Sequence, residues 1–483
     1  MSSSVVTAPS SHTRSESFYF DDGDIVVQVE DTLLCFHAFH LQRATAHFDD
    51  VMRARDADVL EGDTLPGFSD DHPLRLEDIK REDFENLLWF FYDSAYKWSG
   101  TVDGRLTPKW ESVLLLAEKY GMNQVAKVTC YALDRAGALD DVRKIALCAR
   151  HDMGKDWVLE ALRRVLLRGE PLSIEESRLL GLETAATLAA AREKLHCNRV
   201  DQGPCAVGLR CTKNQCGYTA VCKEGLHLCY AFGGSNHITL CPRLRNLGPV
   251  ADVPDEHLQS IEFSRTQATT SALSGQVAVH PQGEMFFKVE NSVVRIHSYH
   301  LKRASSVFVD MLQIPNGGIS AEGRSADHPI SLDVKKQDFD SLLWFFYDSP
   351  YQWSYITDPS LSVKWEAVLA IADMFNMEDV CRVATYALDH HGGLTDIRKI
   401  SLCVRHSVGT TWALQALQNV CVRQDAITPD EARDMGLEMT TLLAAAREQA
   451  MRQQFKCSSG AIKIAPEVAQ KIVTDTILHT QGG

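Results

Sequence analysis

Hydrophobic positions near the start of the chain first alternate with period two and then recur with a helical period. Residues 25–29 alternate in polarity, and after a turn residues 33–36 are apolar again, which predicts the two strands of a hairpin. Between residues 40 and 52 the apolar side chains fall three or four positions apart, as on one face of a helix. Residues 72–79 alternate once more, so a short third strand is expected.

The apolar pattern downstream of this strand is helical. Phe84, Leu87, Leu88 and Phe91 share one side of a helix, and Gly121 fits a stop between two later helices. The spacing predicts helices over 82–92, 109–120, 123–134, 140–150, 155–167 and 174–195. Two strands, a helix, a strand and then helices alone make an α+β plan: a small sheet flanked by helices, with an all-helical C-terminal extension.

The whole pattern occurs twice. The string LLWFFYDS stands at Leu87–Ser94 and again at Leu342–Ser349, and the string AAARE at Ala189–Glu193 returns at Ala444–Glu448. The match runs from about residue 23 to 193 and from 283 to 448, which is the length of a duplicated domain rather than of a solenoid repeat. Each copy is long enough to bury its own core.

The duplication sets the expected domain boundaries. They are a disordered N-terminus at 1–17, a first module at 18–137 with a helical extension at 138–196, a Cys-rich linker at 197–278, a second module at 279–392 with its extension at 393–455, and a C-terminal tail at 456–483.

Several residues of both copies carry a family resemblance. In the first copy they are Gly23 to Val26, Phe36 with His37, Leu41 with Arg43, Ala44 and Phe48, and Asp83 with Phe84 before the repeated string; in the second they are Gly283 to Phe286, Ile296 with His297, Leu301 with Arg303, Ala304 and Phe308. This arrangement resembles the BTB/POZ fold, in wording close to the large fungal set of BTB proteins. The resemblance implies two tandem BTB/POZ modules.

The same resemblance implies that each module binds proteins and dimerises through its first strand and first helix. The dimer interface is therefore expected to include Asp24, Ile25, Val27, His37, Leu41, Phe48, Glu284, Met285, Phe287, His297, Leu301 and Phe308. His37 and His297 each accompany an acidic residue, but no motif brings a nucleophile to them, so a structural or interface role is expected rather than catalysis.

The repeated LLWFFY segment is apolar all round for two turns. Aromatic residues at helical spacing usually belong to a core, yet one face of such a helix has to meet something beyond that core. That face could meet either the partner module or a ligand peptide, because exposed aromatic side chains are typical binding anchors. The candidate anchors are Trp89, Phe90, Tyr92, Trp344, Phe345 and Tyr347.

Composition narrows the class of protein. The 483 residues are 45% hydrophobic and 23% charged, with a formal net charge of −15, which disfavours an extensive nucleic-acid-binding surface and adhesion to anionic membranes. The Ser-rich start has no long apolar run, so a secretory signal is not expected. We expect a cytoplasmic or nuclear protein whose 14 cysteines are thiols or metal ligands.

Half of the cysteines lie in the linker, between Cys197 and Cys241. Cys211, Cys216, His237 and Cys241 have spacings loosely compatible with a Zn site, although the linker contains no CxxC pair. Two alternatives remain open: a tether without a fold of its own, and a mildly basic segment that contacts nucleic acid. Apart from Zn in the linker, no cofactor is expected.

No phosphate-binding loop, GxSxG or HExxH pattern occurs, so the chain is not expected to be an enzyme. The sequence predicts an interaction protein that dimerises within or between chains and recruits other proteins. In the BTB family some relatives are substrate adaptors that bind a cullin in a RING ubiquitin ligase, and this role is one expectation. The alternative is a BTB-dimerised, Zn-dependent transcriptional regulator that uses the Cys-rich linker.

Overall fold

The computed structural model describes residues 12–49, 66–98 except 68, 103–200, three short strands between 221 and 240, 283–313, 322–353, 357–455 except 407, and 466–478. It divides into two compact units. One unit comprises Met1–Asp103, Pro108–Val128 and Ser274–Gly483, and the other comprises Gly104–Thr107 and Thr129–Leu273. Each unit is described by itself, and "first repeat" and "second repeat" denote the two copies of the pattern.

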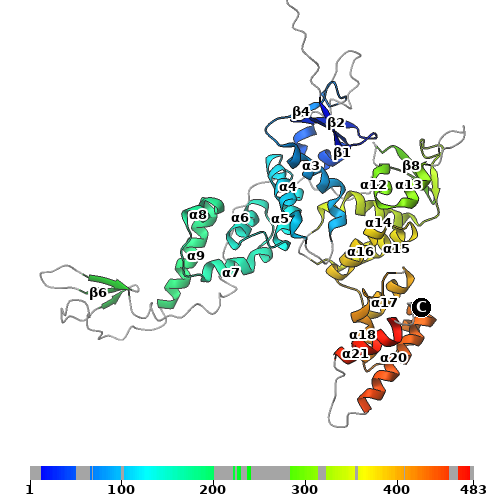
Figure 1. Cartoon of the computed structure of the whole chain (residues 1–483). Helices are drawn as coiled ribbons and strands as arrows, with labels where there is room; N and C mark the ends of the chain where they lie inside the picture. The colour runs from blue at the N-terminus through cyan, green and yellow to red at the C-terminus, as the bar shows by residue number, and fades with distance from the viewer. Residues whose placement is uncertain are drawn as a thin grey trace, which may run out of the picture. The chain divides into compact units, whose positions relative to one another are not determined.

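The sheet of the first repeat has four strands in the order β1-β3-β2-β4 (Figure 1). The hairpin of β2 (Ile25–Val29) and β3 (Thr32–Phe36) is antiparallel, and β4 (Leu74–Leu76) runs parallel to β2. All three were expected. The fourth strand, β1 (Thr13–Tyr19), runs parallel to β3 and was not. The expected disordered N-terminus, residues 1–17, is corrected here: Thr13 already lies in a strand whose mostly polar sequence, TRSESFY, shows no alternation.

The sheet of the second repeat has three strands in the order β10-β8-β9. Again β8 (Met285–Val289) and β9 (Ser292–Ile296) form an antiparallel hairpin, and β10 (Ile330–Leu332) runs parallel to β8. A glycine precedes each hairpin because the backbone passes close to the neighbouring strand. A Cβ on Gly23 would lie 2.8 Å from the Phe36 nitrogen, and one on Gly283 would lie 2.5 Å from the Ile296 carbonyl carbon.

The helices follow in the same order in both repeats. In the first they are α1 (Phe39–Ala44), η1 (Ala46–Phe48), α3 (Arg81–Tyr92), η2 (Ser94–Lys97), η3 (Gly104–Leu106), α4 (Thr107–Lys119) and α5 (Asn123–Arg135). In the second they are α12 (Ser298–Ala304), α13 (Ser306–Gln313), α14 (Lys336–Tyr347), η5 (Ser349–Tyr351), η6 (Pro359–Leu361), α15 (Ser362–Met374) and α16 (Glu378–His391). The expected α+β class is confirmed.

The first helical extension belongs to the second unit. It contains α6 (Asp141–His151), η4 (Lys155–Val158), α7 (Leu159–Leu167), α8 (Ile174–Leu180) and α9 (Leu182–Val200). The single helix expected over 174–195 is wrong, because Gly181 adopts φ 79° and separates α8 from α9. A capping box in which Ser173 and Glu176 exchange hydrogen bonds begins α8.

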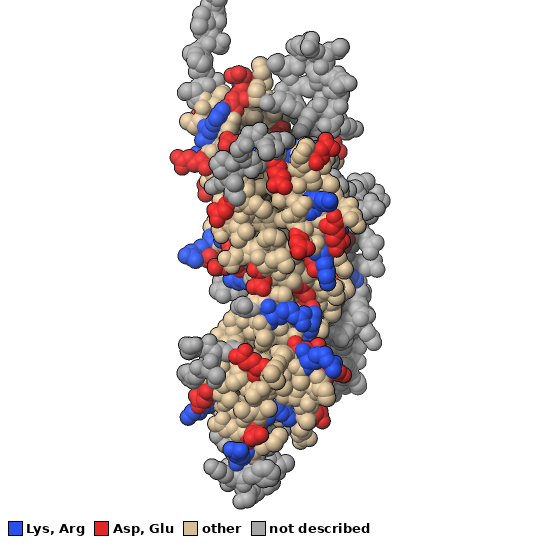
Figure 2. Space-filling view, turned by 90° about the vertical axis from the view of Figure 1, so that its right-hand side faces the viewer, with Lys and Arg blue, Asp and Glu red and all other residues tan. Residues whose placement is uncertain are grey.

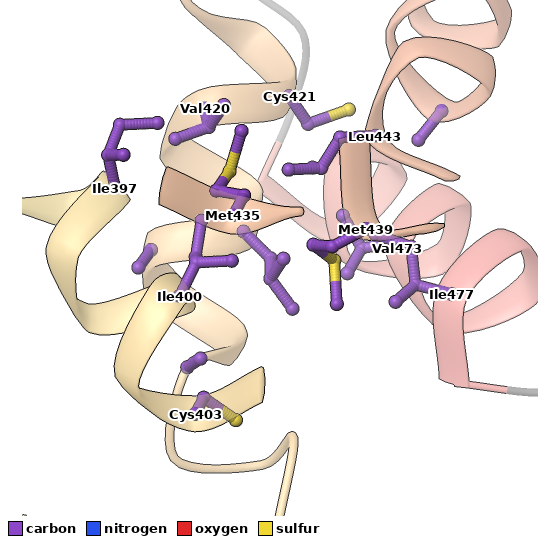
Figure 3. Close-up of a cluster of buried hydrophobic side chains, with 14 of the residues drawn as sticks. Ile397, Ile400, Cys403, Val420, Cys421, Met435, Met439, Leu443, Val473 and Ile477 are labelled. Carbon is purple, nitrogen blue, oxygen red and sulfur yellow. The ribbon is translucent and has the colours of Figure 1, made fainter. Parts of the chain in front are cut away.

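The second extension repeats the four α-helices of the first, and two further elements follow them. It contains α17 (Asp396–Arg405), α18 (Leu414–Val422), α19 (Pro429–Met435), α20 (Leu437–Phe455), α21 (Pro466–Val473) and η7 (Thr474–Leu478). Figure 3 shows its core, in which Met435, Met439 and Leu443 lie between the side chains of α17 and α18 and those of α21 and η7. The second extension therefore has an apolar core of its own.

The repeated string AAARE has a structural explanation. Arg192 is buried and donates hydrogen bonds to the carbonyl oxygens of Val165, Arg168 (2.7 Å) and Glu170 (2.9 Å) at the end of α7. Arg447 does the same for Val420 and Asp425 (2.8 Å) at the end of α18. In each copy the guanidinium thus satisfies one carbonyl group in the last turn of a helix, at Val165 or Val420, together with carbonyl groups of the residues that follow the helix.

The linker contains a small antiparallel sheet in the order β5-β6-β7, formed by Val221–Lys223, Leu226–Cys229 and His237–Leu240. His237, one of the expected Zn ligands, is therefore the first residue of β7. The other three, Cys211, Cys216 and Cys241, lie outside the described residues.

Candidate interface between the repeats

Two histidines lie against each other where the first and second repeats meet. His37 follows β3 and His297 follows β9, and the centroids of their rings are 4.4 Å apart. Both side chains are 1% exposed. We call this contact region between the two repeats the seam, and its residues belong to one compact unit.

A tyrosine of the same repeat holds each histidine. The Tyr92 hydroxyl lies 2.7 Å from His37 Nδ1 and accepts a hydrogen bond of 3.0 Å from the His37 backbone N–H. The Tyr347 hydroxyl makes both contacts with His297 at 3.0 Å. Burial raises the pKa of both tyrosines and lowers that of His37, although the carboxylates near His37 act in the opposite direction. The His37 imidazole is therefore neutral at pH 7.

Aromatic rings extend the seam on both sides of the histidines. Tyr299 of the second repeat lies 4.7 Å from the ring centroids of both Phe20 and Tyr92. At the other end Trp98 and Trp353 stack at 4.6 Å with an interplanar angle of 16°. Such pairs contribute about 0.5–1.5 kcal/mol each beyond the area that they bury.

Two equivalent ion pairs flank the aromatic rings. Arg43 of the first repeat lies 2.5 Å from Asp348 of the second, and Arg303 of the second lies 3.0 Å from Asp93 of the first. Each guanidinium also lies over a tyrosine ring, Arg43 at 5.1 Å from Tyr351 and Arg303 at 4.7 Å from Tyr96. Burial raises the pKa of Asp348, and Arg43 opposes this shift.

The structure divides the residues expected at the interface into two groups. The first group, His37, His297 and Glu284, lies at the seam. The two acidic residues have equivalent hydrogen bonds: Asp24 accepts one from the Ala38 backbone N–H (2.6 Å), and Glu284 accepts one from the Ser298 backbone N–H. The other expected interface side chains, Ile25, Val27, Leu41, Phe48, Met285, Phe287, Leu301 and Phe308, are all buried.

Core packing within a repeat accounts for several of these buried side chains. Phe308 packs against Phe287 and Phe375 of its own repeat, with ring centroids at 6.2 and 4.7 Å, and Phe48 packs against Tyr120 at 5.2 Å. Strand and helix periodicity identifies buried positions, but it does not distinguish a core from an interface.

The six candidate aromatic anchors are all buried, and they too have different neighbours. Trp89 and Trp344 each contact a tryptophan of their own repeat, with ring centroids at 5.0 Å. The four others reach across the seam: Phe90 to Tyr351 (5.9 Å), Phe345 to Tyr96 (5.7 Å), Tyr92 to Tyr299 and Tyr347 to Phe39 (5.4 Å). The second face of the LLWFFY helix therefore lies against the other repeat.

Sequence reasoning missed Tyr299, Trp98, Trp353 and the two ion pairs. A signal for the ion pairs was present, since an aspartate ends each otherwise apolar run, as Asp93 and Asp348, and an arginine recurs in each first helix, as Arg43 and Arg303. Opposite charges repeated beside buried segments favour a reciprocal pairing. The side-chain neighbours of the aromatic residues had no such signal.

Comparison with known families identifies part of the chain. Residues 283–392, from before β8 to the end of α16, match the family model of the BTB/POZ domain. No curated protein and no solved structure matches the chain. The BTB/POZ expectation is thus confirmed for the second repeat, and a BTB/POZ domain is a protein–protein interaction and dimerisation module.

Surface charge and helix hydropathy add two observations. On the face in Figure 2, Lys and Arg are interspersed with Asp and Glu, and the described residues form no continuous basic area there. Among the helices that the structure describes, none is both long and apolar enough to cross a membrane.

Proposed function

We propose that this chain is a tandem BTB/POZ protein without enzymatic activity, whose two modules pair within the chain and recruit other proteins. The observation that carries the proposal is the reciprocity of the seam. Arg43 with Asp348 and Arg303 with Asp93 are the same contact made twice with the roles of the repeats exchanged. Isologous contacts of this kind are the signature of a twofold dimer.

The first repeat supports the proposal through its topology. Its strands β2, β3 and β4 have the same directions and pairing as β8, β9 and β10 of the matched BTB/POZ domain. A dimerisation module and a second copy of the same fold, joined in one chain, favour intramolecular pairing because the linker keeps their effective concentration high.

Light scattering on the full-length chain tests pairing within the chain. We expect the mass of one chain, 53.8 kDa, over a wide range of concentration. Arg43→Asp should lower the melting temperature by placing two carboxylates together, and the double variant Arg43→Asp with Asp348→Arg should restore much of it. A mass of two chains, or no rescue by the charge swap, would contradict the proposal.

Recruitment of partners is the second part of the proposal, and the helical extensions support it. Leu182 and Leu437 occupy equivalent first positions of α9 and α20 and are 87% and 86% exposed. A single exposed leucine is common on protein surfaces, but its recurrence at the same place in both copies makes this position our choice for the contact with a partner. Among possible partners we propose a cullin, which would make the chain a ubiquitin ligase adaptor of the cytoplasm or nucleus.

Affinity capture of the full-length chain from a native lysate, with mass spectrometry, tests this role. A cullin recovered in near-equal amount, and lost from a variant carrying Leu182→Asp and Leu437→Asp, is the expected result. Lys109→Ala with Lys364→Ala, an equivalent pair of surface changes in α4 and α15, serves as the matched control. Capture without any cullin would contradict the adaptor role and leave the pairing proposal untouched.

A further inference from the structure

Three side chains with metal-binding atoms converge at the seam, and no role has been assigned to them as a group. Asp22 stands just before β2, His37 just after β3, and Glu284 just before β8. One ligand atom from each lies within 4.8 Å of the other two. The cluster draws on both repeats, since Asp22 and His37 belong to the first and Glu284 to the second.

The imidazole of His37 presents one ring nitrogen to the cluster. Its Nδ1 is occupied by the Tyr92 hydroxyl at 2.7 Å, whereas Nε2 is buried and takes part in no hydrogen bond. The nearest carboxylate oxygen, Asp22 Oδ1, is 3.7 Å from Nε2, which is beyond hydrogen-bonding distance. A buried polar atom without a hydrogen bond, directed at two carboxylates, calls for a missing partner.

In each of the two carboxylates, one oxygen accepts a hydrogen bond from Ser298 and the other lies in the cluster. Glu284 Oε1 accepts a hydrogen bond from the Ser298 backbone N–H, while Glu284 Oε2 is buried without a hydrogen bond. Asp22 Oδ2 accepts from the Ser298 hydroxyl at 3.3 Å, and Oδ1 is the oxygen nearest to His37. Ser298 therefore orients both carboxylates while leaving an oxygen of each available.

We propose that Asp22, His37 and Glu284 bind one divalent transition-metal ion of the Zn²⁺ type across the seam. Zn²⁺ accepts imidazole nitrogen at about 2.0–2.1 Å and carboxylate oxygen at about 2.0–2.2 Å, and three protein ligands with a water molecule complete a tetrahedral site. An imidazole ligand favours this class of ion over Mg²⁺ or Ca²⁺, which prefer oxygen. Small side-chain movements suffice to bring the three ligand atoms to one ion.

The surroundings of His37 suit a metal ligand. In the tautomer that leaves the Nε2 lone pair for the metal, Nδ1–H donates to the Tyr92 hydroxyl oxygen, an outer hydrogen bond of the kind that fixes ligating histidines. The ion would compensate two carboxylates that face each other at the edge of a buried contact.

The site should occur once per chain. By the alignment of Gly23 with Gly283, the residue equivalent to Asp22 in the second repeat is Gln282, which has no carboxylate. The equivalent site with the roles of the two repeats exchanged therefore lacks one of its three ligands. One ion bound by residues of both repeats would stabilise their pairing, because a ligand that binds the paired state alone shifts the equilibrium towards it.

Metal content of the full-length chain after equilibrium dialysis against Zn²⁺ tests the proposal. The linker cysteines stay unchanged in every sample, so any Zn²⁺ that they bind is common to all of them. We expect wild type to hold one more Zn²⁺ per chain than Asp22→Asn and Glu284→Gln, which keep the shape of each side chain. Asp21→Asn, a neighbouring exposed acid outside the cluster, should match wild type.

Thermal unfolding of the same samples gives the second readout. Zn²⁺ should raise the melting temperature of wild type and of Asp21→Asn more than that of Asp22→Asn or Glu284→Gln, while all four remain folded in a chelator. Equal Zn²⁺ content, or an equal thermal shift, in all four proteins would overturn the proposal. Because the site requires paired repeats, the hydrodynamic radius of each sample is measured as well: repeats that come apart enlarge the radius at unchanged mass, which separates a loss of pairing within the chain from a loss of metal alone.

Discussion

The two repeats differ on the outer face of their sheets. In the first repeat β1 lies beside β3, and Tyr19 packs on a cluster of Val26, Leu33 and Cys35. In the second, β9 is the edge strand of the described sheet. Leu33 is 3% exposed, whereas its counterpart Val293 is 41% exposed.

The residues on this face differ according to whether a strand such as β1 covers them. The counterpart of Cys35 is Arg295, whose guanidinium lies 5.4 Å from the ring centroid of Phe286 and hence covers part of the apolar face itself. Charged residues on an edge strand also discourage pairing with strands of other chains.

The seam shows the opposite behaviour. Its histidine–tyrosine contacts and its arginine–aspartate pairs are the same in both repeats. Comparison of the two regions teaches that the histidine–tyrosine and arginine–aspartate contacts of the seam are alike in both repeats, whereas residues facing away from the seam differ with their local cover. The following predictions test that distinction, from the largest expected effect to the smallest.

Removing equivalent rings from the two repeats should cost similar amounts of stability. Phe90 and Phe345 are fully buried, and each also contacts a tyrosine of the other repeat. Phe90→Ala and Phe345→Ala should each lower the free energy of unfolding by about 3–5 kcal/mol, measured by urea denaturation. Leu115→Ala, at a 57% exposed position of α4, is the control with little change. A negligible effect of either phenylalanine variant would break the proposed equivalence.

Removing β1 should uncover the outer sheet face of the first repeat. Burial, with a smaller effect of nearby carboxylates, raises the pKa of the Cys35 thiol to about 11. In a variant lacking residues 1–19 this pKa should return towards 9.0, which raises the thiolate fraction near pH 7 by roughly 100-fold. Alkylation followed by peptide mass spectrometry should show faster labelling of Cys35, with the buried Cys148 as internal control. Unchanged labelling would mean that β1 is not what protects this face.

The two ion pairs of the seam should differ in strength. Arg303 lies near Asp379 (3.7 Å) as well as Asp93, whereas the first-repeat counterpart of Asp379 is Gln124. Arg303→Ala should therefore cost about 1 kcal/mol and Arg43→Ala about 0.5 kcal/mol in unfolding measurements. In an Asp379→Asn background the gap should shrink. If the gap persists there, the second carboxylate is not its cause.

His391, which only the second repeat has, should make the stability of the protein sensitive to acid. His391 Nδ1 accepts a hydrogen bond of 3.1 Å from the Asp358 backbone N–H, and burial lowers its pKa below 6.5, with His390 adding to the shift. The unfolded chain then binds the proton more readily, so the free energy of unfolding should fall as pH falls through 6.5. The variant His391→Gln should flatten this slope, whereas a change at Ala136, its counterpart, should not. Identical slopes for wild type and His391→Gln would refute the assignment.

Much of the fold could be predicted from the sequence because its segments are strongly periodic. The strands at 25–29 and 33–36 and the helix at 82–92 all appear within a residue or so of their expected bounds. The strand β1 could not be predicted, since Thr13–Tyr19 has too few apolar residues to alternate. Gly181 was missed as a helix end because the apolar spacing continues in phase through it.

The site could be predicted only in part, for a physical reason. Burial explains both a core phenylalanine such as Phe308 and a seam phenylalanine such as Phe345, and the sequence contains the same signal for both. His37 and His297 were identified because they recur at the same place in both copies, each accompanied by an acidic residue. Tyr299 had no such distinguishing feature, and its contacts depend on how the repeats pack.

Joining both sides of the seam in one chain changes what mutation can do to it. In a homodimer every substitution appears on both sides of the axis at once, so an interface can only change symmetrically. Here an acid can be present on one side alone, as Asp22 is opposite Gln282 in the alignment. The pairing would also withstand dilution and exchange with foreign subunits, so the protein would behave alike at low and high expression.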